Sequence, residues 1–190
     1  MSKSINVGEK IKNLRESKNI TREELSERSG LNIDQIISIE ENTNLPSLAP
    51  LIKVARVMGV RLGTFLDDND ELGPVVTRRT DKSDSISFSN NTSGLRKHMD
   101  YYSLSKAKSG RHMEPFIIDI IASKAEFTLS SHEGEEFIYV LDGMIEINYG
   151  KDTYWLEPGD SIYYDSIVAH HVHACNNDAA KILAVVYTPI

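Results

Sequence analysis

Residues 21–38 of this 190-residue chain read TREELSERSGLNIDQIIS and describe two short helices joined by a turn. Thr21–Glu24 has the pattern of a capping box, which marks the start of a first helix over Arg22–Ser29. Gly30 is the residue type that ends a helix, and Asn32 is a favoured cap for a second helix. The stretch therefore predicts two helices that meet through a tight turn.

The flanking sequence extends this helical pattern over residues 1–66. Val7 and Ile11 recur at helical spacing before the turn. After it, Ser47 starts a further helix that stops at Gly59, and a short helical turn closes the set. We therefore expect residues 1–66 to form an all-α bundle of five helices.

Two helices joined by such a turn form a helix-turn-helix, whose second helix enters the DNA major groove with its first side chains on base edges. The wider stretch resembles the Xre/Cro-repressor family of helix-turn-helix domains. The matching segments are Ile11–Arg15, Thr21–Ser26, Gly30-Leu31, Ile36–Glu40 and Pro46–Leu48.

The resemblance implies a set of DNA-contacting residues. They are Arg22, on phosphate or an outer base, and Asn32, Ile33, Asp34 and Ser38 in the groove. Glu40 takes the place of a buried glutamate that braces the fold. The recognition helix has no Lys or Arg, so phosphate neutralisation must come from other residues, such as Lys12, Arg15, Lys18, Arg22, Arg28 and Lys53. We expect a weakly binding monomer, hence a homodimer on double-stranded operator DNA. The alternative is a helical bundle used for protein contact.

Residues 67–110 differ in composition and are predicted to form a linker with lead-in strands. Residues 67–71 are an acidic run, and residues 83–93 are rich in Ser, Asn and Asp. Short strands are expected at Val75–Arg79 and Ile86–Phe88.

Residues 111–190 carry the pattern of an all-β domain. Short runs rich in Ile, Val, Tyr and Phe are separated by turn residues, which is typical of a sandwich or barrel. The runs are Phe116–Ile121, Phe137–Leu141, Met144–Tyr149, Ser161–Tyr164, His170–Cys175 and Ile182–Tyr187.

Two motifs in this half resemble those of the cupin family. Residues 130–143 read SSHEGEEFIYVLDG, and residues 156–164 read LEPGDSIYY before His170. The specific parts are the spacing from Glu136 to Gly143 and the Pro-Gly-Asp turn. The resemblance implies a double-stranded β-helix, or cupin barrel, that binds a small-molecule effector and carries much of the dimer interface.

Metal-binding cupins typically use two histidines and a glutamate from the first motif and one histidine from the second. The resemblance places His132, Glu136 and His170 at three of these positions, while Ser130 stands where the first histidine would be.

The residues alone support related chemistry. Two histidines and a carboxylate can form a facial triad suited to Fe(II), and also to Zn(II), Ni(II) or Mn(II). On a continuous strand, His132 and Glu136 would face the same side because they are four residues apart. The expected strand His170–Cys175 offers two alternatives, since His170 shares a face with Val172, and His171 shares the other face with His173. The resemblance favours His170.

We expect the effector pocket to be lined by Ser130, His132, Glu136, Tyr139 and His170. Instead of a metal ion, the histidines could bond an organic ligand, and the Glu136 carboxylate could bind a cation such as a polyamine. The other strand tyrosines, Tyr149, Tyr154, Tyr163 and Tyr164, are more typical of packing residues.

The charge of the chain is divided unevenly between its halves. Its net charge is −7, yet residues 1–66 carry 10 basic and 8 acidic side chains and residues 67–190 carry 11 and 20. No apolar run is long enough for a membrane helix, and residues 1–6 lack the apolar core of a signal peptide. A single cysteine excludes an internal disulfide. We therefore expect a cytoplasmic protein.

These observations favour a transcriptional regulator, not an enzyme, in which a DNA-binding domain is controlled by an effector in the barrel. A metal-dependent cupin enzyme of the dioxygenase or isomerase type is the main alternative. A third alternative is an architectural protein whose barrel only dimerises.

Overall fold

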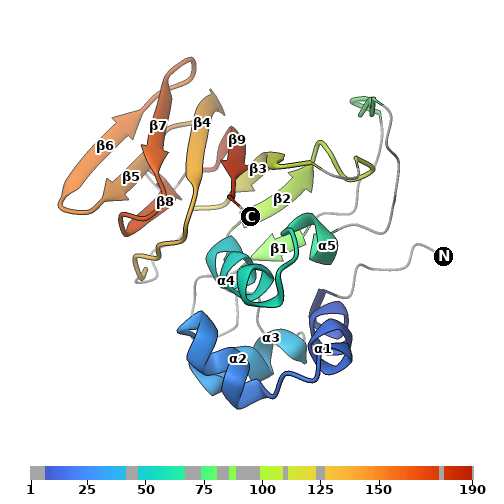
Figure 1. The fold of residues 1–190 in the computed structure, drawn as a ribbon. Coiled ribbons are helices and arrows are strands. Elements are labelled where there is room, and N and C mark those ends of the chain that lie inside the picture. The colour runs from blue at the N-terminus through green and yellow to red at the C-terminus, as the bar shows by residue number, and fades with distance from the viewer. Residues whose placement is uncertain are drawn as a thin grey trace.

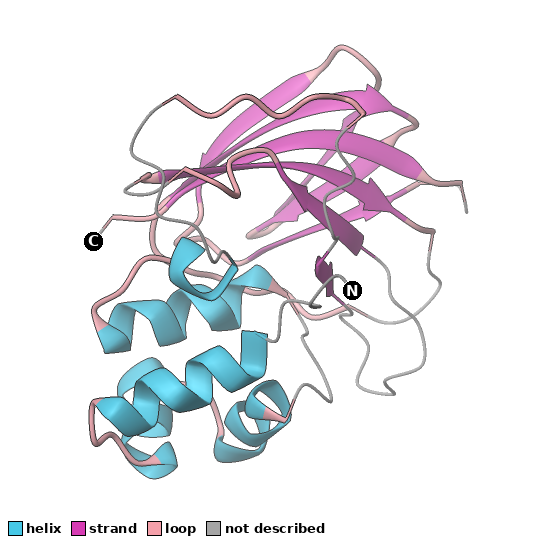
Figure 2. Ribbon diagram, turned by 90° about the vertical axis from the view of Figure 1, so that its right-hand side faces the viewer, coloured by secondary structure: helices cyan, strands magenta, loops and turns pink. Residues whose placement is uncertain are grey.

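The computed structural model describes residues 7–41, 47–66, 74–80, 86–88, 99–108, 111–122, 127–175 and 178–189. Helices gather in one half and strands in the other, as Figures 1 and 2 show from two sides. The helices are α1 (Val7–Ser17), α2 (Arg22–Ser29), α3 (Ile33–Glu40), α4 (Leu48–Met58) and α5 (Gly63–Leu66).

The caps expected for α2 and α3 are both present. Thr21 and Glu24 form a reciprocal capping box at α2, and Asn32 and Gln35 form a second one at α3. Gly30 ends α2 with a φ of 69°, a conformation that glycine adopts without a steric penalty. The two helices of the motif are therefore fixed at their ends by local hydrogen bonds.

The helical half is held together by one apolar core. Side chains from all five helices are buried there, including Ile11, Leu25, Ile39, Leu51 and Phe65. The apolar faces predicted from helical spacing are thus the faces that pack together.

The strand half contains two antiparallel sheets. The larger sheet has the order β1-β2-β3-β9-β4-β7, and the smaller one has the order β6-β5-β8. The strands are β1 (Ile86–Phe88), β2 (Met99–Ser103), β3 (Met113–Ile120), β4 (Glu135–Asp142), β5 (Ile145–Tyr149), β6 (Asp152–Leu156), β7 (Ser161–Asp165), β8 (His170–Ala174) and β9 (Ala180–Tyr187). This β-rich layout, with its buried inner faces, confirms the predicted all-β architecture.

The observed strands differ from the expected ones in three places. Val75–Arg79 forms no strand, and β2 and β6 were not expected. β6 is hard to recognise because it lies at the edge of its sheet, with Tyr154 and Trp155 exposed beside Asp152. β2, in turn, pairs with β3 over five residues and so belongs to the main sheet.

The two halves touch along α4 and α5, which lie between the sheets and the other three helices (Figure 1). Arg56 of α4 forms an ion pair with Glu133 in the loop before β4. At α5, a Cβ added to Gly63 would lie 2.7 Å from Arg111 Nη2 and 2.9 Å from Glu114 Oε1. Arg111 and Glu114 form an ion pair of the strand half, and α5 packs closely against it at Gly63.

Within the described residues, none of the helices is long and apolar enough to cross a membrane.

Candidate metal centre and nucleic-acid interface

His132, Glu136 and His170 meet in the strand half, and their ligand atoms all lie within 4.8 Å of one another. His132 Nε2 lies 2.7 Å from Glu136 Oε1, and His170 Nε2 lies 3.4 Å from the same oxygen. Glu136 is on β4 and His170 on β8, so the cluster joins the two sheets. Of the alternatives for β8, His170 points inward.

His132 reaches this cluster from a loop, so His132 and Glu136 do not lie on one continuous strand. β4 begins at Glu135. Gly134 has a φ of 111° and turns the chain before β4. The His132 amide donates to Ser166 O at 3.0 Å, and the Ser166 amide donates to Gly134 O at 2.9 Å. These two backbone hydrogen bonds bring His132 beside Glu136.

Ser130 acts through its backbone. It exchanges two hydrogen bonds with His170, Ser130 N to His170 O at 3.0 Å and His170 N to Ser130 O at 2.9 Å. This isolated bridge ties the loop that carries His132 to the strand that carries His170. Ser130, which stands where the cupin pattern has a histidine, thus fixes the separation of His132 and His170.

The outer nitrogens of both histidines are held by main-chain oxygens. His132 Nδ1 lies 3.0 Å from Glu133 O, and His170 Nδ1 lies 2.8 Å from Val168 O. A carbonyl oxygen accepts only, so each Nδ1 carries the proton and donates it. The Nε2 atoms therefore face Glu136, as in histidine metal sites where the other nitrogen is fixed by a hydrogen bond.

Both Glu136 oxygens are engaged. The Tyr164 hydroxyl donates to Oε2 at 2.8 Å, and the Ser166 hydroxyl donates to Oε1 at 3.4 Å. Burial raises the pKa of Glu136, but hydrogen bonds and charge from His132 and His170 outweigh it, so this pKa lies well below its usual value. The donor set fits a divalent ion, because a carboxylate and two oriented imidazoles converge on one point.

The charge of Glu136 is felt by its neighbours. Burial lowers the pKa of His170, but the hydrogen bond and charge of Glu136 outweigh burial and raise it. Burial, followed by the charge of Glu136, raises the pKa of both Tyr101 and Tyr164, which therefore stay protonated. The packing role expected for Tyr164 is incomplete, since its hydroxyl supports the carboxylate.

The cluster opens into a small cavity. The volume that the centres of water molecules can occupy in it is about 80 Å³. Ser130, His132, Glu136 and His170 line it, together with apolar side chains such as Ile138. Tyr139 lies on the opposite face of β4, is 38 % exposed and does not line this cavity. The alternation of side chains along a strand explains this placement, because Tyr139 is an odd number of residues from Glu136.

The helical half also lines this cavity, which no feature of the sequence predicts. Ser47, Leu48 and Ala49, at the start of α4, contribute to its wall. Such a contact depends on how the two halves pack, and no local motif encodes it.

Of the residues predicted to contact DNA, Asn32, Ile33 and Asp34 lie at the start of α3, Ser38 lies further along the same helix, and Arg22 opens α2. Asn32 and Asp34 are exposed, and Ile33 and Ser38 are half-buried on the same helix. Asn32 Oδ1 also accepts the capping hydrogen bond from Gln35 N, and the exposed first turn of α3 is presented to solvent.

Two of the basic residues expected on phosphate have internal partners. Arg15 is buried, and its Nε donates to Glu40 Oε1 at 2.6 Å, so its assignment to phosphate is wrong. Arg22 Nε donates to Glu40 Oε2 at 2.8 Å, although its side chain remains 32 % exposed. Burial raises the pKa of Glu40, but the hydrogen bonds from Arg15 and Arg22 outweigh it and lower this pKa. Glu40 thus braces α1, α2 and α3.

Comparison with known proteins identifies both halves. A family profile described as "Helix-turn-helix" matches residues 11–65, and one described as "Cupin domain" matches residues 117–186. The (S)-2-hydroxypropylphosphonic acid epoxidase of Streptomyces wedmorensis is 28 % identical over 153 residues, which cover 73 % of this chain and 73 % of that protein.

Solved structures share the whole two-part layout. An HTH_3 family transcriptional regulator from Vibrio cholerae has a TM-score of 0.67 at 19 % identity, over 98 % of this chain and 97 % of that one. The Fe(II) form of HppE in complex with substrate has a TM-score of 0.53 at 23 % identity, over 98 % of this chain and 100 % of that one. These likenesses concern the fold. The chain is therefore a two-domain protein in which a helix-turn-helix domain of the Xre type precedes a cupin domain.

Proposed function

We propose that this protein is a sequence-specific, DNA-binding transcriptional regulator whose cupin domain binds a divalent metal ion and a small-molecule effector. The observation that carries the proposal is the capped α3, which presents Asn32 and Asp34 to solvent in a helix-turn-helix domain. Amide and carboxylate groups at the start of such a helix read base edges, Asn on adenine and Asp on the cytosine amino group.

The distribution of charge supports a dimer on DNA. With Arg15 buried, the exposed cations of the helical domain that could face phosphate include Lys12, Lys18 and Arg28. A few phosphate contacts give weak, salt-sensitive binding. Two helix-turn-helix domains, held together by a pair of cupin domains, would double these contacts and read two half-sites.

The test begins with selection of bound sequences from a pool of random DNA duplexes by the full-length protein. We expect an enriched motif with two half-sites. Asn32→Ala and Asp34→Ala should each weaken binding to that motif by about tenfold, since one base contact is worth about 1–3 kcal/mol. Lys151→Gln, in the β5–β6 turn, is the matched control. Failure to enrich any motif would refute the proposal.

Effector control can be tested on the same operator. Binding to DNA and binding to the cupin cavity must change each other by the same factor if they are coupled. Operator affinity should therefore differ between the metal-free protein and the protein loaded with Fe(II) or Zn(II). Equal affinities would leave a DNA-binding protein without a metal-dependent switch.

A second candidate function is a metal-dependent enzyme, favoured by the complete cluster of His132, Glu136 and His170 and by the 28 % identical epoxidase. Bound Fe(II) would supply open positions for substrate and an oxidant. In this chain the two histidines and Glu136 would hold the ion, and Tyr164 would keep the carboxylate oriented.

The two candidates are separated by assay of the Fe(II)-loaded protein with (S)-2-hydroxypropylphosphonate, which the name of that relative specifies. Substrate-dependent consumption of dioxygen or peroxide that disappears in Glu136→Gln would establish an enzyme. No turnover, together with an enriched operator motif, would favour the regulator.

A further inference from the structure

We propose that the cleft between α4 and the loop before β4 binds an amphipathic organic anion, a carboxylate with an apolar body, which competes with Glu133 for Arg56. This site is distinct from the metal-centre cavity and adds a second ligand to the proposed function. It does not depend on a metal ion at Glu136.

The cleft is the roomier of the two cavities described. Its space for the centres of water molecules is about 480 Å³, against about 80 Å³ for the metal-centre cavity. Its walls come from both domains, with Lys53, Arg56 and Arg61 on the helical side and Glu133 and Ile167 on the cupin side. A site of this kind, largely apolar with a few polar groups, is typical of small-molecule binding.

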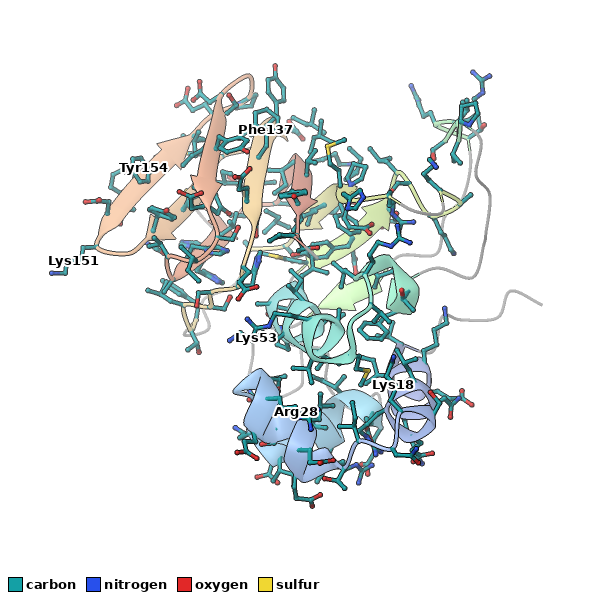
Figure 3. All side chains as sticks on the ribbon, in the orientation of Figure 1. Lys18, Arg28, Lys53, Phe137, Lys151 and Tyr154 are labelled. Carbon is teal, nitrogen blue, oxygen red and sulfur yellow. The ribbon has the colours of Figure 1, made fainter. Side chains whose placement is uncertain are left out.

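The charges in the cleft favour an anion. Lys53, Arg56 and Arg61 line it, and Glu133 is the single acidic side chain among the described residues of its lining. Figure 3 shows Lys53 on α4. Three cations against one carboxylate leave an excess of positive charge, which a carboxylate ligand would neutralise.

The remaining lining explains why the anion should carry an apolar body. Ile52, Val60, Leu62 and Pro189 line the same cleft. Ile167 lines it too and is 63 % exposed. A ligand with an alkyl or aromatic portion would remove this surface from water.

The ion pair between Arg56 and Glu133 provides the competition. It joins the two domains, and its side chains are 49 % and 47 % exposed, so solvent and ligands can reach it. A ligand carboxylate can offer Arg56 the same planar pair of oxygens that Glu133 offers. Ligand binding would therefore release Glu133, which directly follows His132, a residue shared by both cavities.

The experiment compares octanoate with 1-octanol on the full-length protein by isothermal titration calorimetry. We expect octanoate to bind and 1-octanol to bind at least about tenfold more weakly, because it lacks the charge. Lys53→Gln and Arg61→Gln should each weaken octanoate about tenfold, since hydrogen bonds to charged groups are the stronger class. Lys151→Gln, which Figure 3 places at the far end of the β5–β6 hairpin, should have no effect.

Glu133→Gln is the decisive variant. If Glu133 competes with the ligand, its neutralisation should tighten octanoate binding about threefold to tenfold. If the Arg56–Glu133 pair only holds the domains together, the same variant should leave binding unchanged or weaken it. The proposal would be overturned if Glu133→Gln left octanoate binding unchanged or weakened it. It would also be overturned if octanoate did not bind, or if octanoate and 1-octanol bound equally well. Glu133 is exposed, so this variant is expected to fold.

Discussion

Glu136 is a single carboxylate that receives hydrogen bonds from side chains on three sides. His132 and His170 approach one oxygen, and Tyr164 donates to the other. The contact from Tyr164 is an outer one, of the kind that orients a metal ligand and adjusts its basicity. The Tyr164 hydroxyl therefore matters to metal affinity although it does not face the ion.

Tyr164→Phe should weaken binding of Zn(II) or Fe(II) by about tenfold, because the loss of an outer hydrogen bond typically costs 10–100-fold in metal affinity. The measurement is a competition titration against a chelating dye. Tyr163→Phe is the matched control, since the Tyr163 hydroxyl donates to Glu135 on the outer face of the same pair of strands. Equal effects from both variants would contradict the role given to Tyr164.

Glu40→Gln should destabilise the helical domain by about 3 kcal/mol at neutral pH, because it leaves Arg15 buried without its carboxylate. The pKa of Glu40 lies below its ordinary value of 4.5, so its contribution is present above about pH 4.5 and is lost as the pH falls through the folded pKa. The difference in the free energy of unfolding between the wild type and Glu40→Gln, measured by urea denaturation, should therefore narrow in acid.

The control for this variant is Glu41→Gln, which changes an exposed neighbour. It should shift stability by less than about 0.5 kcal/mol at every pH. A gap between wild type and Glu40→Gln that stays constant down to pH 2 would argue that the Glu40 pKa is not lowered by its two arginines.

The three ligands could be named from the sequence because their types and spacing follow the cupin pattern. Tyr139 was placed wrongly although the sequence carried the signal, because Tyr139 is an odd number of residues from Glu136 and side chains alternate along a strand. Ser166 and the start of α4 could not be named, since Ser166 reaches Glu136, and α4 reaches the cavity, through contacts between distant segments.

At the scale of elements, the turn at Gly134 determines where β4 begins. A Cβ added there would lie 2.0 Å from Tyr187 O, far inside van der Waals contact, and the φ of 111° disfavours any other residue. Because Gly134 O accepts from the Ser166 amide, the turn also positions the loop that carries His132.

Gly134→Ala should cost more than about 3 kcal/mol of stability and lower metal affinity, whereas Gly159→Ala should cost about 1 kcal/mol. Gly159 also has a positive φ, 98°, but a Cβ there would meet nothing within 4 Å. The comparison thus separates the clash from the backbone conformation. Thermal unfolding and metal titration measure the two effects, and equal losses would contradict the close approach.

The elements differ in how readily the sequence predicts them. α2 and α3 are marked at both ends by local signals, two capping boxes and Gly30, and the structure confirms them. β2 and β6 carry no comparable signal. β2 follows a stretch rich in polar residues, and β6 is an edge strand, so their pairing depends on partners far along the chain.

At the scale of the whole molecule, the division of charge sets how DNA binding should respond to salt. The affinity for operator DNA should fall steeply with salt, in proportion to the number of phosphates contacted. Arg28→Gln removes one phosphate contact from each half of the dimer, so it should reduce the slope of log affinity against log salt by about 2, and Lys151→Gln should not change it. A slope unchanged by Arg28→Gln would indicate that Arg28 does not contact phosphate.

The order of strands has a consequence for how the chain is made. β9, Ala180–Tyr187, lies between β3 and β4 in the larger sheet and pairs with both along their length. During synthesis the helix-turn-helix domain can therefore fold early, while β3 and β4 wait with open edges for a strand that leaves the ribosome much later. A nascent chain that stalls before residue 180 would thus present a folded head and an incomplete, aggregation-prone sheet.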